Sequence, residues 1–252
     1  MPIYLINRDE VKSEAKQLLK TARVSPVAMT ALLLGITLLL DLADTAAGRL
    51  TGASVGILSF SFSFVSIFTM LLGTVLTAGY ARYCLCVQRG ASLPYSGLFD
   101  AFPFAGRVIL LTLLQGVLIA LGLLLFIIPG IVLAFSYFFA LYHLIEEPDS
   151  GVVEALRRSR TEMQGYKWQL FMLFLSFWPL MLLAAIAMGV CEYFLQNAFP
   201  NTLTGDLLYT LISGLVAAAA QLYLLPYMQL SQVGFYRRAV QHKETPPDES
   251  AS

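Results

Sequence analysis

The residues of this sequence most able to bind a substrate are polar side chains inside long apolar stretches. Gln115 and Gln221 are the clearest cases, because hydrocarbon offers such groups no hydrogen-bond partner. A serine seam of Ser59, Ser63 and Ser66 at helical spacing is a further candidate for a substrate path. The alternative is that these side chains hydrogen-bond between helices, where each bond contributes about 1 kcal/mol.

Signatures of catalysis and of metal binding are missing from the sequence. It has no H-E-x-x-H, no G-x-S-x-G, no phosphate-binding glycine loop and no carboxylate pair at helical spacing within an apolar stretch. His143 and His242 have no partner at metal-ligand spacing. Cys84 and Cys86 point to different faces of a helix and Cys191 lies near the other membrane surface, which disfavours a disulfide. We therefore predict a non-enzymatic protein without cofactor or metal.

Two groups of basic residues could bind the head groups of anionic lipids or the carboxylates of a protein partner. The first lies on the flank of a helix expected over Asn7 to Arg23, and the second lies in the segment Ser150 to Gly165. Their members are Lys12, Lys16, Lys20 and Arg23 in the first group and Arg157, Arg158 and Arg160 in the second. The alternative is that these charges only set the topology of the chain.

Composition identifies the elements that must position these side chains. Of the 252 residues, 58% are hydrophobic and 13% are charged, too few for the charged surface of a soluble domain. Equal numbers of acidic and basic residues leave no overall positive charge to attract nucleic acid. We predict an all-α membrane protein with six transmembrane helices, because six stretches approach the roughly 20 apolar residues that cross a bilayer. They are Val27 to Ala43, Gly56 to Gly79, Arg107 to Ile127, Ile131 to Glu146, Trp168 to Val190 and Asp206 to Met228.

The third and fourth stretches are separated only by Ile128-Pro129-Gly130-Ile131. Proline removes a backbone donor and glycine allows a reversal, so we predict a tight helical hairpin with its turn at Pro129 and Gly130. The alternative is one kinked helix, but the 40 residues from Arg107 to Glu146 are twice the length that a bilayer requires. Pro179 and Pro226 are expected to kink the fifth and sixth helices.

Residues 1–26 are predicted to contain a cytoplasmic amphipathic helix, 27–238 to form the six-helix domain and 239–252 to be a disordered cytoplasmic tail. Asn7 and Glu10 have the spacing of a capping box at the start of the first helix. The apolar residues of this helix share one face, and they are Val11, Ala15, Leu18, Leu19 and Ala22. We expect that face to rest on the membrane surface; a plain solvated helix is the alternative.

Loop charges predict the orientation, because short loops rich in Lys and Arg stay cytoplasmic. With six spans, 15 of the 16 Lys and Arg fall on the side that carries both termini, and only Arg49 falls opposite. We therefore expect both termini in the cytoplasm and anionic lipids beside them. The loops 94–102 and 148–156 are weakly similar, which suggests three units of a serine-capped surface helix followed by two spans, unless the similarity is due to chance.

Several ordered motifs resemble the bacterial integral-membrane family catalogued as domain of unknown function nine-seven-five. The motifs are the opening 8–20, Ser96-Gly97-Leu98-Phe99, Ile128-Pro129-Gly130-Ile131, Ser136-Tyr137, 154–159, 165–171, Leu175-Ser176-Phe177, Pro226-Tyr227 and Phe235-Tyr236. This resemblance implies a six-span protein of the bacterial cytoplasmic membrane. It implies no reaction, ligand or cofactor.

Three functions are compatible with these features. The first is a non-enzymatic membrane scaffold or accessory subunit whose basic helices contact lipid or a membrane-protein partner. The second is a transporter or exporter of an amphipathic or apolar compound, with Gln115, Gln221 and the serine seam lining its path. An intramembrane enzyme is the third, and no catalytic motif in the sequence supports it.

Overall fold

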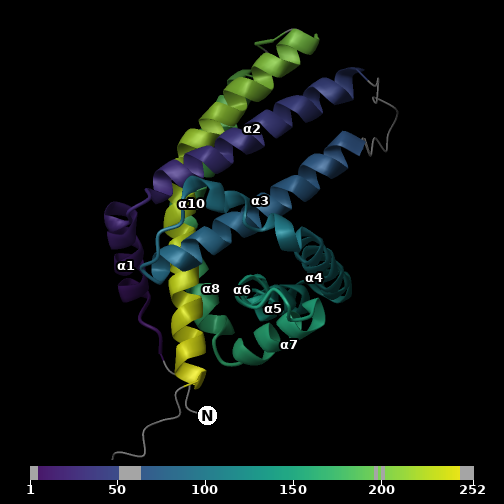
Figure 1. Cartoon of the computed structure of the whole chain (residues 1–252). Helices are drawn as coiled ribbons and strands as arrows, with labels where there is room; N and C mark the ends of the chain where they lie inside the picture. The colour runs from purple at the N-terminus through teal and green to yellow at the C-terminus, as the bar shows by residue number, and fades with distance from the viewer. Residues whose placement is uncertain (1–4, 51–63, 196–197, 200–201, 245–252) are drawn as a thin grey trace, which may run out of the picture.

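The computed structural model describes residues 5–50, 64–195, 198–199 and 202–244, and its regular elements in these ranges are all helical (Figure 1). The elements are α1 (Arg8–Thr21), α2 (Pro26–Leu50), α3 (Phe64–Gln88), the 3-10 turns η1 (Tyr95–Phe99) and η2 (Phe102–Phe104), α4 (Ala105–Leu125), α5 (Ile127–Ser136), α6 (Ala140–Glu146), α7 (Val152–Glu162), α8 (Lys167–Leu175), α9 (Trp178–Leu195) and α10 (Leu203–Glu244).

Six stretches of the described chain are long and apolar enough to cross a membrane, which confirms the predicted all-α polytopic fold. They are Pro26–Gly48, Val65–Gln88, Tyr95–Leu125, Ile127–Glu146, Trp178–Leu195 and Leu203–His242. The fourth stretch contains a break between α5 and α6, and the predicted fifth span is divided into α8 and α9 just before Pro179.

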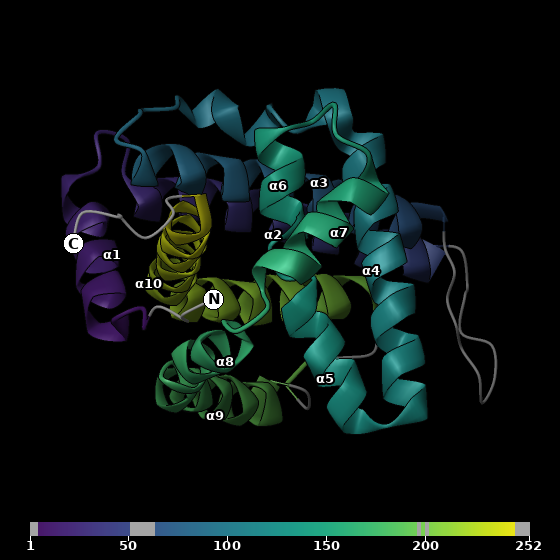
Figure 2. The same ribbon diagram turned by 90° about the horizontal axis from the view of Figure 1, so that it is seen from below.

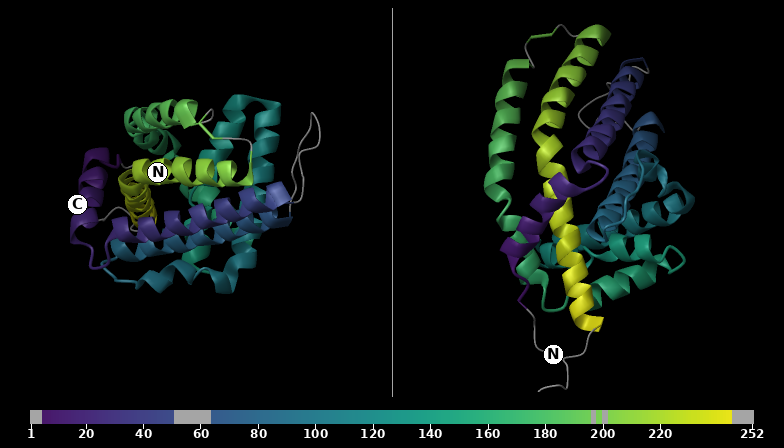
Figure 3. Two further views of the ribbon diagram at one scale, coloured as in Figure 1. Left: turned by 90° about the horizontal axis from the view of Figure 1, so that it is seen from above. Right: turned by 60° about the vertical axis from the view of Figure 1, so that its left-hand side comes forward.

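Four of these stretches run roughly side by side: α2, α3, α9 and the first half of α10 (Figure 3). The contact between α2 and α10 is close at Gly214, where an added Cβ would lie 2.3 Å from Leu38 Cδ1. Thr45 and Thr210 add a hydrogen bond of 3.2 Å between the same two helices. The pair formed by α4 and α5 crosses the direction of the other four (Figure 2).

The predicted hairpin between the third and fourth spans is present, but its turn lies before Pro129. The reversal is made at Phe126, which has an extended backbone between α4 and α5, whereas Pro129 and Gly130 lie inside the first turns of α5. Gly130 serves close packing and not the reversal, because an added Cβ would lie 2.8 Å from the Leu123 backbone nitrogen. Pro129 is tolerated near the start of α5 because the backbone nitrogens of the first turn of a helix have no acceptor within the helix. The missing N–H of proline therefore costs no helical hydrogen bond at this position.

The N-terminal helix begins as predicted, with the Asn7 side chain accepting a hydrogen bond from the Asp9 backbone nitrogen at 3.1 Å. The apolar face of α1 does not rest on a membrane surface, which corrects the expected placement. Val11 and Ala15 are fully buried, and α1 packs against α10, where Val11 Cγ1 lies 3.5 Å from the Cβ position of Gly234. The apolar face of this amphipathic helix is therefore covered by another helix of the same chain.

The last helix is longer than predicted, because α10 runs to Glu244 and takes in the first residues assigned to a disordered tail. Residues 245–252 lie outside the described chain. Pro226 is inside this helix, and the two halves of α10 point in different directions (Figure 2). At about 1.5 Å per residue its 42 residues reach about 63 Å, twice the bilayer core, so the second half extends beyond the spans.

The predicted serine caps and the related repeat units are not present in the predicted form. Ser150 donates to the Glu147 carbonyl oxygen at 2.7 Å, and Gly151 is the N-cap residue of α7 without a side-chain bond. The segment around Ser96 forms the 3-10 turns η1 and η2 instead of an α-helix. Asp, Gly and Pro nearby favour turns, which compete with helix formation at such short lengths.

Packing is densest at the end of the molecule that we call the basic end. It comprises α1, the end of α3, the start of α4, α6, α7 and the second half of α10. Arg238 of α10 pairs with Glu14 of α1 at 3.1 Å, and Arg237 of α10 donates to the Gln88 carbonyl oxygen at the end of α3. Fully buried aromatic residues gather here, and among them are Tyr80, Tyr83, Phe139, Phe235 and Tyr236. The helix α9, in contrast, has no buried residue.

Candidate functional site

The two glutamines predicted inside the spans do not form a common site. Gln115 on α4 donates from Nε2 to the Tyr137 carbonyl oxygen at 2.7 Å, at the break between α5 and α6. This is the structural alternative for Gln115, a hydrogen bond between helices to a carbonyl oxygen that also accepts from the Ala140 backbone nitrogen. Gln221 is half-buried on α10, and no hydrogen bond joins it to another residue of the described ranges.

The serine seam is described only at Ser66, since Ser59 and Ser63 lie outside the described residues. Ser66 on α3 donates to the Asp44 carboxylate of α2 at 2.5 Å. This bond closes the α2 and α3 pair at the end opposite the basic end. Gln115 and Ser66 thus take part in separate helix contacts, and the structure does not join them in one path.

The first basic group lies on α1 and is partly used inside the molecule. Lys12 Nζ lies 4.9 Å from the centre of the Phe177 ring, and Lys16 Nζ lies 5.7 Å from the centre of the Tyr227 ring. Such cation–π contacts contribute roughly 0.5–1 kcal/mol at exposed sites. Burial beside these groups lowers the pKa of Lys12 from its ordinary value. These two lysines therefore help to hold α1 against the helix breaks at Phe177 and Pro226.

The second basic group lies on α7, where two of its three members are paired within the chain. Arg157 donates to both oxygens of Glu154 at 2.9 Å, and Arg158 donates to Glu147 at 2.8 Å and to Glu154 at 3.3 Å. The hydrogen bond from Arg157 is the largest cause that lowers the pKa of Glu154, and the same pairing raises the pKa of Arg157. Bonding to Glu147 raises the pKa of Arg158. A partner of Arg157 or Arg158 would therefore have to compete with these internal carboxylates.

The helix α7 is held by an apolar face that is buried against the rest of the protein. Val152, Leu156 and Met163 are buried against the rest of the protein, as expected for a face that packs on neighbouring spans. Val153 is instead 71% exposed, because residues adjacent in a helix point about 100° apart and only one of the pair can face inward. The helix is fixed by its buried face, and the arginines lie on its outer side.

Three members of the basic groups remain available at the surface. Lys20 and Arg23 at the end of α1 and Arg160 on α7 are exposed. Within the part of the chain that the structure describes, no carboxylate or aromatic ring is paired with any of them. A partner's carboxylate or phosphate would therefore not have to displace an internal ion pair at these three positions.

Sequence analysis missed a buried polar cluster at the centre of the basic end. His143 of α6 is 6% exposed, and its Nε2 lies 2.7 Å from Glu162 Oε2 of α7. Its Nδ1 lies 3.3 Å from the Tyr236 hydroxyl of α10, which donates to Glu146 at 2.8 Å. Arg89 at the end of α3 also pairs with Glu146. The cluster joins four helices.

The hydrogen-bond directions in this cluster define the tautomer of His143. Because the Tyr236 hydroxyl donates to Glu146, it accepts from His143 Nδ1, so the Nδ1 atom carries a hydrogen. His143 Nε2 and Glu162 Oε2 are in close contact at 2.7 Å but make no hydrogen bond of regular geometry. The spacing of His143 and Glu146, three residues apart at the end of an apolar stretch, was the available sequence signal.

A family model described as "Protein of unknown function (DUF975)" matches residues 115–243, just over half of the chain. The chain belongs to this family. No curated protein and no solved structure gives a significant match. The membership confirms the resemblance on which the six-span architecture was expected, and the family description assigns no activity.

Within the DUF975 match lie most of the motifs that carried the resemblance, from Ile128-Pro129-Gly130-Ile131 to Phe235-Tyr236. The opening at 8–20 and the Ser96-Gly97-Leu98-Phe99 loop precede it. His143, Glu146, Glu162 and Tyr236 also lie in the matched range, and Arg89 does not. The matched range comprises the second half of α4, α5 to α9 and nearly all of α10, and α1, α2 and α3 pack against α10 in this chain.

Proposed function

We propose that the protein is a non-enzymatic membrane scaffold or accessory subunit, with its basic end in the cytoplasm and both termini there. The observation that carries this proposal is the location of the packed core. Buried aromatic and polar side chains gather at the basic end, whereas α9 has no buried residue and α4 exposes most of its apolar side chains. The most tightly packed part of the protein is therefore the basic end, and we propose that it forms a rigid surface beside the membrane.

The chemistry of that surface favours an acidic partner. Lys20, Arg23 and Arg160 are exposed, and the helices that carry them are held in place by their buried faces. Binding therefore does not have to pay the entropy of ordering these helices. The excess of Lys and Arg at this end supports a cytoplasmic location. The proposed partner is a membrane protein with a carboxylate-rich surface, and anionic lipid head groups supply an additional attraction of about 1 kcal/mol per cation.

The test is quantitative co-purification from native membranes after mild cross-linking. We expect a stoichiometric partner with the parent protein and its loss in the triple variant Lys20→Gln/Arg23→Gln/Arg160→Gln. Twelve Lys and Arg remain on that side to hold the orientation. The matched control is Arg8→Gln, an exposed arginine outside the proposed contact. Equal recovery of the same partners with the parent and the triple variant would exclude this surface as the contact.

One observation favours the alternative function, a transporter of an amphipathic or apolar compound. The buried His143 at the end of the fourth span is in close contact with Glu162 of α7, and ionisable groups within spans often mark proton or substrate paths in membrane proteins. In this case Gln115→Leu/Gln221→Leu should abolish uptake or efflux by reconstituted vesicles. The scaffold proposal predicts instead that this double variant keeps its partner and that vesicles show no protein-dependent flux.

A further inference from the structure

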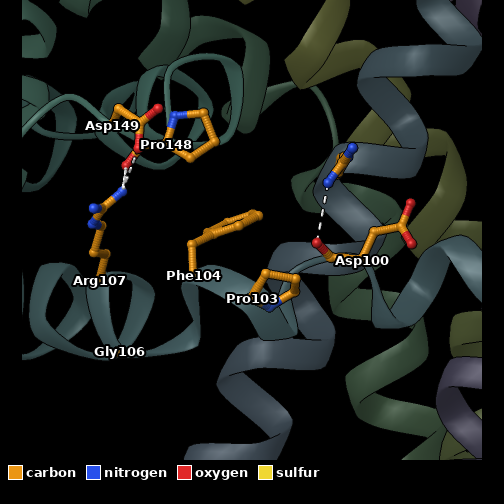
Figure 4. Close-up of a pocket in the computed structure, with 8 residues that line it drawn as sticks. Asp100, Pro103, Phe104, Gly106, Arg107, Pro148 and Asp149 are labelled. Carbon is orange, nitrogen blue, oxygen red and sulfur yellow. Dashed lines mark hydrogen bonds and ion pairs between the residues drawn. The ribbon is translucent and has the colours of Figure 1, made fainter.

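A pocket of about 580 Å³ lies at the basic end between the end of α3 and the start of α4. Its lining includes two arginines and two aspartates, and these are Arg82, Arg107, Asp100 and Asp149. Figure 4 shows Phe104 between the Arg107 and Asp149 pair on one side and Asp100 on the other. The lining thus carries two positive and two negative side chains around one aromatic ring.

Both guanidinium groups are oriented by the protein and keep donors for a ligand. Arg82 uses Nη1 to donate to the Asp100 carbonyl oxygen at 3.0 Å. Arg107 uses Nη1 to donate to the Pro148 carbonyl oxygen and to Asp149 Oδ1, the latter at 3.3 Å. In the described chain Nε and Nη2 of each arginine have no such bond, and the first-turn amides of α4 at Gly106 and Arg107 face no intrahelical acceptor.

A second, apolar groove lies between the same two helices, and its nearest lining residue on α4 is one helical turn after Gly106 of the pocket. It has a volume of about 410 Å³ and is formed by α3 and α4 residues, among them Met70, Thr74, Ile109, Leu113, Gly116 and Ala120. The groove begins at Ile109, two residues after Arg107. From Ile109 to Ala120 it extends about 16 Å along α4, which is half of a hydrocarbon core of about 30 Å. A groove of this length can take most of one extended acyl chain.

The floor of this groove is open because Gly116 has no side chain there. An added Cβ at Gly116 would meet no atom within 4 Å, and Gly116 and Ala120 are both exposed. The small-residue spacing that usually brings two helices together is left unused here. A slender flexible chain fits such a groove better than the ridge of a helix, since the groove is confined by α3 along one side.

We propose that the pocket and the groove together bind one phospholipid with a primary ammonium in its head group, of the phosphatidylethanolamine type. The phosphate is held by Arg82, Arg107 and the first turn of α4, because guanidinium groups and helix N-termini bind phosphate oxygens. The ammonium is held by the exposed carboxylate of Asp149, beside Arg107, and one acyl chain fills the groove. The balanced charge of the lining favours this zwitterion over an anionic lipid.

The test is lipid binding to the delipidated full-length protein, measured by native mass spectrometry and by the melting temperature. Palmitoyl-oleoyl phosphatidylethanolamine, phosphatidylglycerol and phosphatidylcholine are titrated separately. We expect one saturable site for the ethanolamine lipid and about tenfold weaker binding of the choline lipid, because a quaternary ammonium cannot donate hydrogen bonds to carboxylates. Tighter binding of the glycerol lipid would overturn the assignment to a zwitterion.

Two variants separate the head-group and acyl-chain contacts. Arg82→Gln/Arg107→Gln is expected to weaken binding at least tenfold, with Arg8→Gln/Lys167→Gln as the control that also removes two positive charges. Gly116→Leu places a side chain in the groove without a backbone clash and should also remove the site. Its control is Gly189→Leu, at an exposed position of α9 that is likewise open. If Gly116→Leu binds the lipid as the parent does, or if no titration saturates, the proposal is wrong.

Discussion

Single residues at the basic end show how a membrane protein accommodates buried charge. His143 and Glu162 lie in different helices, and neither His143 Nε2 nor Glu162 Oε2 has another hydrogen-bond partner in the described chain. Each therefore depends on the other to offset the cost of its own burial. The pair also specifies how α7 is docked, because a shift of one turn would separate the two groups.

The residue-scale prediction is a measurable coupling within this pair. We expect His143→Phe to lower the free energy of unfolding by about 1–3 kcal/mol, since it leaves the Glu162 carboxyl without its ion-pair partner. Glu162→Leu should have a similar cost. The double variant should cost less than the sum of the two single ones, as measured by denaturant unfolding in detergent. Additive effects, within about 0.5 kcal/mol, would show that the two groups do not interact.

Helices and turns show where sequence patterns are sufficient and where they are not. The predicted six spans and the hairpin are present because length, apolar composition and a proline-glycine pair are local properties. The position of the hairpin turn was wrong by a few residues, since Gly130 is required by the approach of Leu123 from another helix. A contact between helices leaves no mark in local composition.

The amphipathic helix α1 illustrates the same limit. Its periodicity predicts correctly that Val11 and Ala15 must be covered, but an apolar face fits a bilayer and a neighbouring helix equally well. The second half of α10 packs on this face of α1. The length of α10 could not be inferred from the sequence by a search for a segment that crosses the bilayer once. The polar cluster around His143 was missed for a related reason, because its members come from four separate helices.

The element-scale prediction concerns the α4 and α5 hairpin. Gly130→Ala is expected to destabilise the protein by about 1–3 kcal/mol, because the new Cβ would lie 2.4 Å from Leu123 Cδ2 and the core must shift. Gly116→Ala on α4 is the matched control, where the new Cβ meets nothing and helix propensity favours alanine by up to about 1 kcal/mol. Melting temperatures of the two purified variants should move in opposite directions. If both variants melt at the parental temperature, the close packing at Gly130 is not required.

At the scale of the whole molecule, the packed basic end contrasts with the loosely packed helices above it. The start of α1 and the end of α10 lie at the same end, with α1 held against α10 (Figure 1). Exposed apolar side chains on α4 and α9 suit contact with lipid, and the ordered polar end suits contact with another macromolecule. The proposed scaffold role therefore requires that the basic end faces the cytoplasm.

Thiol accessibility in intact cells tests that central claim most directly. Two single-cysteine variants are compared in a background with Cys84, Cys86 and Cys191 changed to alanine, because the buried Cys84 would not report on topology. One carries Lys20→Cys at the basic end, and the other carries Ala198→Cys at the exposed turn between α9 and α10. We predict that a membrane-impermeant maleimide labels Ala198→Cys in intact cells and labels Lys20→Cys only after permeabilisation. Labelling of Lys20→Cys in intact cells would contradict the cytoplasmic location of the basic end and, with it, the proposed scaffold.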